Sequence, residues 1–280
     1  MADFKRKDDY NDKTIKRIKD ISEKHNDILF VPNKDCVKGY YNGLVVFEKI
    51  TDQCENLVKR SPYADWDKHQ DEILHEIEKG MPRDRERKTQ QIIAQNNMTF
   101  AENDYSVCGF ETVISTNDLH IEGKNGGPEI DLVAIRPDKG SILLIEYKCK
   151  GSSMLNGNQN IERHYEDYRA ILHSEVMDSI KAEMLKAYKL LCRLHGVKAQ
   201  ERLLTPDGYK AQIAFLFVDK VYDKDGNIES EITDDDYSDA WDLIESKDLS
   251  DILYIRCHEP KDVVLNTWKP LVHSGLKMTN

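Results

Sequence analysis

The segment 127–151 constrains the fold of this chain more than any other. It is GPEIDLVAIRPDKGSILLIEYKCKG, in which two runs rich in Val, Ile and Leu flank the turn sequence Pro-Asp-Lys-Gly. Such apolar runs favour strands, and a short turn between them predicts a β-hairpin. A symmetric hairpin that closes on this turn places Asp131 opposite Glu146. In the same register Glu129 faces Lys148.

These four ionisable side chains are expected on one face of the sheet, because side chains alternate along a strand. Carboxylates directly opposite each other have Cβ atoms about 4.5–5.5 Å apart and repel each other. Lys148 can offset this repulsion, and so can a divalent cation, since Mg²⁺ takes one or two carboxylates together with water and phosphate oxygens. The sequence therefore predicts a Mg²⁺ site at Asp131 and Glu146. The alternative is a water-exposed salt-bridge cluster in which Lys148 and Lys150 pair with the two acids.

The rest of the chain alternates helical and strand-like patterns. Helices are predicted over 12–25, 66–79, 83–97 and 161–195, and strands over 40–50, 110–116, 129–137, 141–150, 211–220 and 251–257. From residue 83 the order is helix, three strands, helix, strand, which predicts an α/β sandwich with a mixed sheet. Residues 81–280 are assigned to this domain, and residues 1–80 to a mainly helical extension of unknown role.

The composition limits the classes of partner. The net charge of −11 argues against a protein that coats nucleic acid through a global positive field, although a local basic groove remains compatible with it. Ten acidic residues lie within 229–251, where a solvated helix face is expected.

Other features of the sequence point to a cytoplasmic protein. The apolar runs are far shorter than the ~20 residues of a membrane span, and the N-terminus lacks the apolar stretch of a secretory signal. Six cysteines without a CxxC pair are expected to stay reduced, and structural zinc is not expected.

The spacing of the charged residues resembles the PD-(D/E)xK nuclease superfamily, which has the restriction-endonuclease-like fold. Asp131 is followed, after fourteen residues, by Glu146-Tyr147-Lys148. The resemblance covers about 83–220 and implies an αβββαβ core with a central mixed sheet flanked by helices. The chain departs from the literal pattern at Ile130, which stands where the motif has proline.

The resemblance implies a role for each of these residues. Asp131 and Glu146 would be ligands of Mg²⁺, or of Mn²⁺ in its place, and the backbone carbonyl of Tyr147 would be a third ligand. Lys148 would orient the attacking water and stabilise charge on the phosphate. Glu86, on the predicted helix 83–97, occupies the place of the catalytic helix glutamate of the superfamily, where it can also contact the metal.

Other residues near the motif are weaker candidates. Glu129 is either a metal ligand or the cross-strand partner of Lys148. Members of the superfamily often place polar residues at the start of the helix that follows the lysine strand, and here these are Gln159, Arg163, His164, Tyr165 and Tyr168. The residues expected to contact nucleic acid are Arg85, Lys150, Arg163 and His164.

The sequence therefore predicts a metal-dependent nuclease that hydrolyses phosphodiester bonds, in DNA before RNA. A setting in defence, restriction or repair, and a homodimer or a protein partner, follow from the resemblance only. The alternative is a catalytically inactive subunit that binds nucleic acid or assembles with other proteins. A different metal-dependent phosphoesterase is disfavoured, because neither a GxxxxGK[ST] loop nor an HxD motif occurs.

Overall fold

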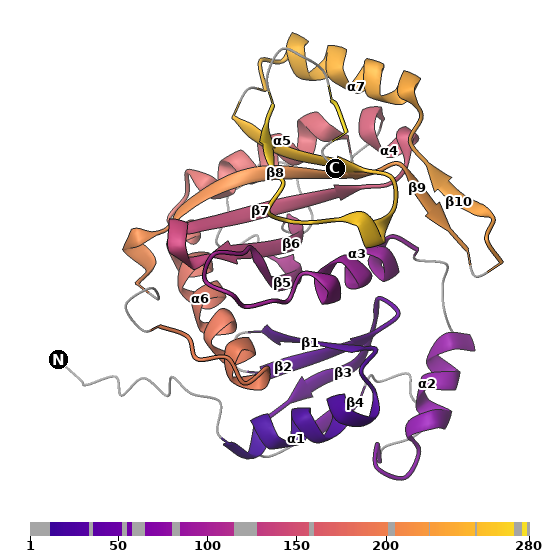
Figure 1. The fold of residues 1–280 in the computed structure, drawn as a ribbon, viewed down its shortest axis with the longest axis vertical. Helices are drawn as coiled ribbons and strands as arrows, with labels where there is room; N and C mark the ends of the chain where they lie inside the picture. Colours follow the sequence, from indigo (N-terminus) through magenta and orange to yellow (C-terminus); the bar gives the residue numbers. More distant parts are fainter. Residues whose placement is uncertain are drawn as a thin grey trace.

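Within the described residues, the protein has a six-stranded and a four-stranded β-sheet with helices packed around them, and a separate two-stranded sheet (Figure 1). The computed structural model describes residues 12–33, 36–51, 55–57, 65–79, 85–114, 128–156, 160–200, 205–223, 225–249, 251–271 and 276–278. It is a mixed α/β structure whose central mixed sheet is flanked by helices, as the sequence predicts.

The central sheet has six strands in the order β12-β11-β8-β7-β6-β5. Their bounds are Ser106–Val113 (β5), Glu129–Arg136 (β6), Ser141–Lys148 (β7), Lys210–Val218 (β8), Ile252–Cys257 (β11) and Lys269–Pro270 (β12). Strands β5, β6 and β7 form an antiparallel meander, whereas β8 runs parallel to β7 and β11 runs parallel to β8. The carboxyl ends of β7, β8 and β11 therefore meet at one edge of the sheet.

The hairpin of β6 and β7 has the predicted register. Its residue pairs run from Leu132 with Ile145 to Arg136 with Ser141, around a single 3-10 turn that ends at Gly140. Gly140 has a left-handed φ of 55°, a conformation that glycine adopts without steric cost. Every side chain of β7 is buried, so both faces of this strand contribute to the core.

One face of the central sheet packs on the C-terminal helices. Helices α5 (Ile161–Leu172), α6 (Val176–Leu194) and α7 (Asp234–Ser246) contribute side chains to this core, and the short helix α4 (Gly151–Leu155) follows β7 directly. The single helix predicted over 161–195 is in fact α5 and α6, separated at Ser174. Ser174 Oγ donates to the carbonyl of Ile171 at 2.8 Å, a local bond that competes with a continuous helix.

The acidic stretch lies mainly in α7, with most of its carboxylates exposed as expected. A capping box between Thr233 and Asp236 starts this helix. Before it, β9 (Lys220–Tyr222) and β10 (Ile228–Glu231) form a separate hairpin. Within the described residues no helix has the length and apolarity to cross a membrane.

The N-terminal part is not mainly helical, so that expectation is wrong for the described residues. Helices α1 (Asp12–Lys24) and α2 (Gln70–Lys79) flank an antiparallel sheet of β1 (Ile28–Asn33), β2 (Cys36–Tyr41), β3 (Leu44–Ile50) and β4 (Glu55–Leu57). The strand predicted over 40–50 is interrupted by Asn42 and Gly43, with φ values of 52° and 80°. Asn-Gly between apolar runs is a hairpin signal, because both residues tolerate positive φ.

The other face of the central sheet packs against α3 (Arg85–Asn96) and the N-terminal sheet (Figure 1). Leu29 and Tyr40 of the N-terminal sheet share one hydrophobic cluster with Ile93 of α3 and with Ile145 and Tyr147 of β7. Helix α3 therefore lies between the two sheets, close to the strand that carries the predicted lysine motif.

Candidate functional site

Asp131 lies where the backbone pairing of β6 becomes irregular. The ladder with β7 reaches Leu132, and beyond it the N–H of Tyr147 donates to Asp131 Oδ2 at 2.8 Å. On the other side, Glu111 of β5 has a left-handed φ of 48°, which is costly for a residue with a side chain. Asp131 is thus held by a backbone donor of the neighbouring strand at an irregular point of the sheet.

Glu146 accepts from three side chains. Lys148 Nζ donates to its Oε1 at 2.6 Å, and the Tyr168 hydroxyl donates to its Oε2 at 2.7 Å. His164 Nδ1 lies 3.1 Å from the same Oε2. Glu146 and Lys148 are both only 2% exposed, so this ion pair is fully buried. A water-exposed salt-bridge cluster, the alternative considered for this hairpin, is therefore not what forms.

The charges of the cluster are not balanced. Burial by itself would raise the pKa of Glu146, but the charge of Lys148 and the hydrogen bond from His164 outweigh it and lower that pKa to about 2. Burial raises the pKa of Asp131 well above its ordinary value, and the carboxylates of Glu146 and Glu86 raise it further. Lys148 therefore neutralises one carboxylate and leaves a second one in an unfavourable field.

Glu86 lies in the first turn of α3, within electrostatic reach of Asp131, as the resemblance implies. Its neighbour Arg87 contacts two further acids: its Nε lies 2.8 Å from Glu111 Oε2 and its Nη2 lies 3.8 Å from Glu129 Oε2. The cross-strand pairing of Glu129 with Lys148 is therefore wrong, because the ladder of β6 and β7 ends at Leu132 and Ile145 and Lys148 turns to Glu146.

The residues predicted to contact nucleic acid lie in different environments from one another. His164 joins the cluster around Glu146, whereas Lys150 is exposed just before α4 and Arg163 is half-buried on α5. The side chain of Arg85 and the whole of Gln159 lie outside the described residues. Tyr168, considered together with these residues, is fully buried and bonded to Glu146, and Tyr165 is buried in the core.

His164 and Tyr168 reach Glu146 because both lie on α5, four residues apart and therefore on the same face of the helix. The His164 Nε2 is buried and has no hydrogen-bond partner in the part of the chain that the structure describes.

The donor set is compatible with Mg²⁺. In the described residues no three His, Cys, Asp or Glu side chains gather closely enough to hold an ion by themselves. Mg²⁺ does not need three, because it commonly binds one or two carboxylates and completes its octahedron with water and substrate oxygens. The hard oxygens of Asp131 and Glu146, and the excess negative charge that raises the pKa of Asp131, fit such a cation. Of the described cysteines, Cys108, Cys149, Cys192 and Cys257 are buried and are not in disulfides.

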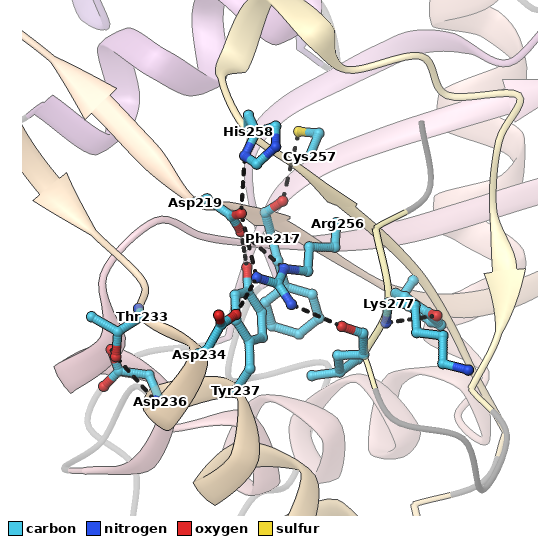
Figure 2. A network of polar contacts seen from close by, with 12 residues as sticks. Phe217, Asp219, Thr233, Asp234, Asp236, Tyr237, Arg256, Cys257, His258 and Lys277 are labelled. Atoms are coloured by element: carbon cyan, nitrogen blue, oxygen red, sulfur yellow. Dashed lines mark hydrogen bonds and ion pairs between the residues drawn. The ribbon is translucent and has the colours of Figure 1, made fainter.

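A second polar network lies at the ends of β8 and β11 (Figure 2). Arg256 donates from Nε to Asp219 Oδ1 at 3.1 Å, and the Tyr237 hydroxyl donates to the same oxygen at 2.7 Å. The guanidinium also lies over the Tyr237 ring, 3.7 Å from its centroid. Its Nη2 contacts Asp234 Oδ1 at 2.9 Å, and its Nη1 donates to the carbonyl of Leu276 at 3.0 Å. This network ties α7 and the C-terminal segment to the sheet.

Sequence reasoning did not find this second network or the contacts of Arg87. Both join residues that are far apart in the chain, such as Asp219 and Arg256, and neither has a local spacing that marks it.

Comparison of the chain with protein-family models, with curated proteins and with solved structures gives no match. The evidence for a function is therefore the chemistry of the site itself.

Proposed function

We propose that the protein is a metal-dependent nuclease with a restriction-endonuclease-like core. The observation that carries this proposal is the buried pair Glu146 and Lys148 beside Asp131, at the ends of two neighbouring strands. A buried ion pair is costly to form, and an additional carboxylate beside it is more so. Such an excess of negative charge favours the binding of a divalent cation, and hydrolysis of a phosphodiester would depend on that bound cation.

The order of elements supports the core that the resemblance implies. Helix α3, strands β5, β6 and β7, helices α5 and α6, and strand β8 follow one another as in the αβββαβ pattern. Strand β8 pairs in parallel with β7, so the crossover through α5 and α6 covers one face of the sheet. The acids and the lysine project from the strands at the centre of this core.

The residues of the site would divide the chemistry among them. Asp131 and Glu146, with the Tyr147 carbonyl as a further ligand, would hold Mg²⁺, and the bound ion would supply the positive charge that polarises a phosphoryl oxygen and lowers the pKa of a bound water. Lys148 places a positive charge where negative charge develops on the phosphate. His164 and Tyr168 hold the Glu146 carboxylate in one orientation, which keeps the ligand oxygens in place.

We propose DNA rather than RNA as the substrate, because the site resembles that of the superfamily. Exposed bases on the elements that carry the site include Lys88 on α3 and Lys150 after β7. A local arrangement of this kind suffices for phosphate binding even in a chain of net charge −11. A homodimer or a protein partner, and a role in defence, restriction or repair, stay predictions.

The proposal is tested by incubating the purified protein with plasmid, linear DNA and RNA in Mg²⁺, Mn²⁺ or EDTA. Asp131→Asn and Lys148→Ala are expected to lower the cleavage rate by roughly 10²–10³-fold. Lys139→Ala is the control, because Lys139 is exposed in the turn of the same hairpin. Cleavage that survives both substitutions would show that this is not the catalytic site. Absence of cleavage on every substrate would favour the inactive nucleic-acid-binding subunit.

A further inference from the structure

The N-terminal sheet touches α3 at the tip of one hairpin. Strands β2 and β3 are joined by Asn42 and Gly43, and Gly43 rests on the backbone of α3. A Cβ placed on Gly43 would lie 2.5 Å from the backbone nitrogen of Lys88 and 2.6 Å from the carbonyl carbon of Arg87. Neither atom is on a flexible side chain, so nothing larger than glycine fits without moving the helix or the hairpin.

A hydrogen-bonded bridge fixes the same contact. The N–H of Gly43 donates to Gln91 Oε1 at 2.7 Å, and Gln91 Nε2 donates to the carbonyl of Asp27 at 2.8 Å. Gln91 is only 3% exposed and its bond from Gly43 is buried, so this bond is costly to break, whereas the bond to Asp27 is partly buried. Gln95, one turn later, also donates to the Asp27 carbonyl, at 3.2 Å. The N-terminal sheet thus holds α3 at two points, the tip of β2–β3 and the start of β1.

The part of α3 that is held in this way is the part nearest the candidate site. Gly43 contacts the helix at Arg87 and Lys88, directly after Glu86, whose charge acts on Asp131. Arg87 reaches Glu111 at 2.8 Å, next to the irregular point of the sheet where Asp131 lies. A displacement of the first turn of α3 therefore moves the position of the Glu86 carboxylate and the ion pairs of Arg87 together.

Packing on β2 reinforces the contact. The Tyr40 ring lies edge-on to Phe110 of β5, with 4.7 Å between centroids, so the strand that leads to the hairpin tip is itself anchored on the central sheet. Burial raises the pKa of Tyr40, and the Glu111 carboxylate that pairs with Arg87 raises it further.

We propose that the N-terminal sheet is a positioning element of the active site, and that the Asn42-Gly43 tip sets the placement of Glu86 and Arg87 relative to Asp131. This inference rests on the proposed function, since it concerns the same metal site. It gives residues 28–50 a role that the sequence alone leaves open. Gly43 and Gln91 act through α3 and touch neither metal nor substrate.

The test compares two glycine substitutions that carry the same backbone strain. Gly43→Ala puts a methyl group against α3, whereas Gly226→Ala places it in open space in the turn of β9 and β10, where Gly226 has a φ of 82°. Mn²⁺ binding is measured by titration calorimetry at a temperature where both variants are folded. We expect Gly43→Ala to weaken Mn²⁺ binding by about tenfold, as supporting residues of metal sites do, and Gly226→Ala to leave it unchanged.

A cleavage assay distinguishes positioning from a general loss of stability. If the hairpin tip positions the metal site, excess Mn²⁺ restores most of the cleavage rate of Gly43→Ala, because the weakened step is binding. Should Gly43→Ala fail to fold, Gln91→Met removes both bridge hydrogen bonds without adding bulk at the tip, and the same shift in Mn²⁺ binding is expected.

The outcomes separate this inference from the proposed function. Equal Mn²⁺ affinity of the wild type and of Gly43→Ala, or of Gln91→Met where that variant replaces it, overturns the positioning role alone. A weaker affinity in Gly226→Ala as well overturns it too, because the effect would then be general strain. A wild type that neither binds Mn²⁺ nor cleaves any nucleic acid overturns the proposed function, and the inference with it.

Discussion

Two buried ionic clusters lie at the ends of neighbouring strands, and they differ in how their charge is balanced. At β8 and β11, the Asp219 carboxylate faces the Arg256 guanidinium and also accepts from Tyr237 (Figure 2). At β6 and β7, the carboxylates of Asp131 and Glu146 face one lysine. The first cluster is a matched pair with its hydrogen bonds distributed over α7 and the C-terminal segment. The second carries an excess of negative charge.

This difference suggests which cluster serves stability and which serves chemistry. The Arg256 guanidinium donates to one buried carboxylate and to one carbonyl, and it pairs with one exposed acid, so this cluster is expected to stabilise the fold. A site that keeps a carboxylate with a raised pKa instead loses stability in the metal-free protein and gains affinity for a cation. The two clusters therefore predict opposite responses to the same kind of substitution.

The largest effect is expected from breaking the balanced cluster. Arg256→Ala removes the guanidinium from the Asp219 carboxylate, which is 5% exposed and still contacts the Tyr237 hydroxyl and the exposed His258 ring, and such a loss costs about 3–5 kcal/mol. The free energy of unfolding in urea measures it. Lys79→Ala is the control, because it breaks an exposed pair with Glu76 that contributes about 1 kcal/mol or less. An Arg256→Ala variant as stable as the wild type would show that this network is not structural.

The next prediction compares the two clusters by the sign of a change in stability. Asp219→Asn is expected to destabilise the protein by about 3 kcal/mol, because it removes the charge that Arg256 needs. Asp131→Asn is expected to stabilise the metal-free protein at neutral pH by on the order of 1 kcal/mol, because it removes repulsion from Glu146 and Glu86. Thermal unfolding in EDTA measures both changes. The same sign for both variants would contradict the contrast.

The gain in Asp131→Asn depends on pH in a definite direction. A folded-state pKa above the unfolded value means that ionisation of Asp131 opposes folding, and that protonation relieves this cost. The stability advantage of the variant is therefore full above the raised pKa of the wild-type carboxyl group, and it disappears as the pH falls from that pKa toward the unfolded value. An advantage that stays constant down to pH 4 would place its origin elsewhere.

A further effect, of similar size to that of Asp131→Asn, concerns the donors around Glu146. Tyr168→Phe removes the 2.7 Å hydrogen bond to Glu146 and is expected to cost about 1–2 kcal/mol. Since the pKa of Glu146 is held at about 2, its stabilising contribution is present above the unfolded value and is lost as the pH falls toward 2. The variant should therefore begin to unfold in acid at a higher pH than the wild type, as followed by circular dichroism. Tyr105→Phe, which loses a bond to the neutral Ser141 hydroxyl, should not.

The hairpin at the centre of the site is predictable from the sequence, because its turn and the alternation of side chains are local. The pairs from Leu132 with Ile145 onward follow from the position of the turn. What happens beyond the last pair is not local: Asp131 accepts a backbone N–H, and Lys148 contacts its own strand neighbour Glu146. The alternation rule places these groups on one face but does not say which of them bond.

Other parts of the site could not be predicted for the same physical reason. His164 and Tyr168 lie among the candidates, but their contact with Glu146 depends on how α5 crosses the sheet. The Asn42-Gly43 turn is a sequence signal for the N-terminal sheet. The prediction of one strand over 40–50 did not take this turn into account. Its contact with α3 is a tertiary packing feature with no signature in the sequence.

The position of β7 in the sheet has a consequence for how the protein is made. Its first neighbour, β6, precedes it directly, but its second neighbour, β8, starts only at Lys210, after α4, α5 and α6. Until that segment leaves the ribosome, one side of β7 is an open edge with unpaired backbone groups, which invites pairing with other chains. Parallel pairing across such a crossover also forms slowly. The strand that holds Glu146 and Lys148 is therefore the part of the nascent chain at which aggregation is expected to begin.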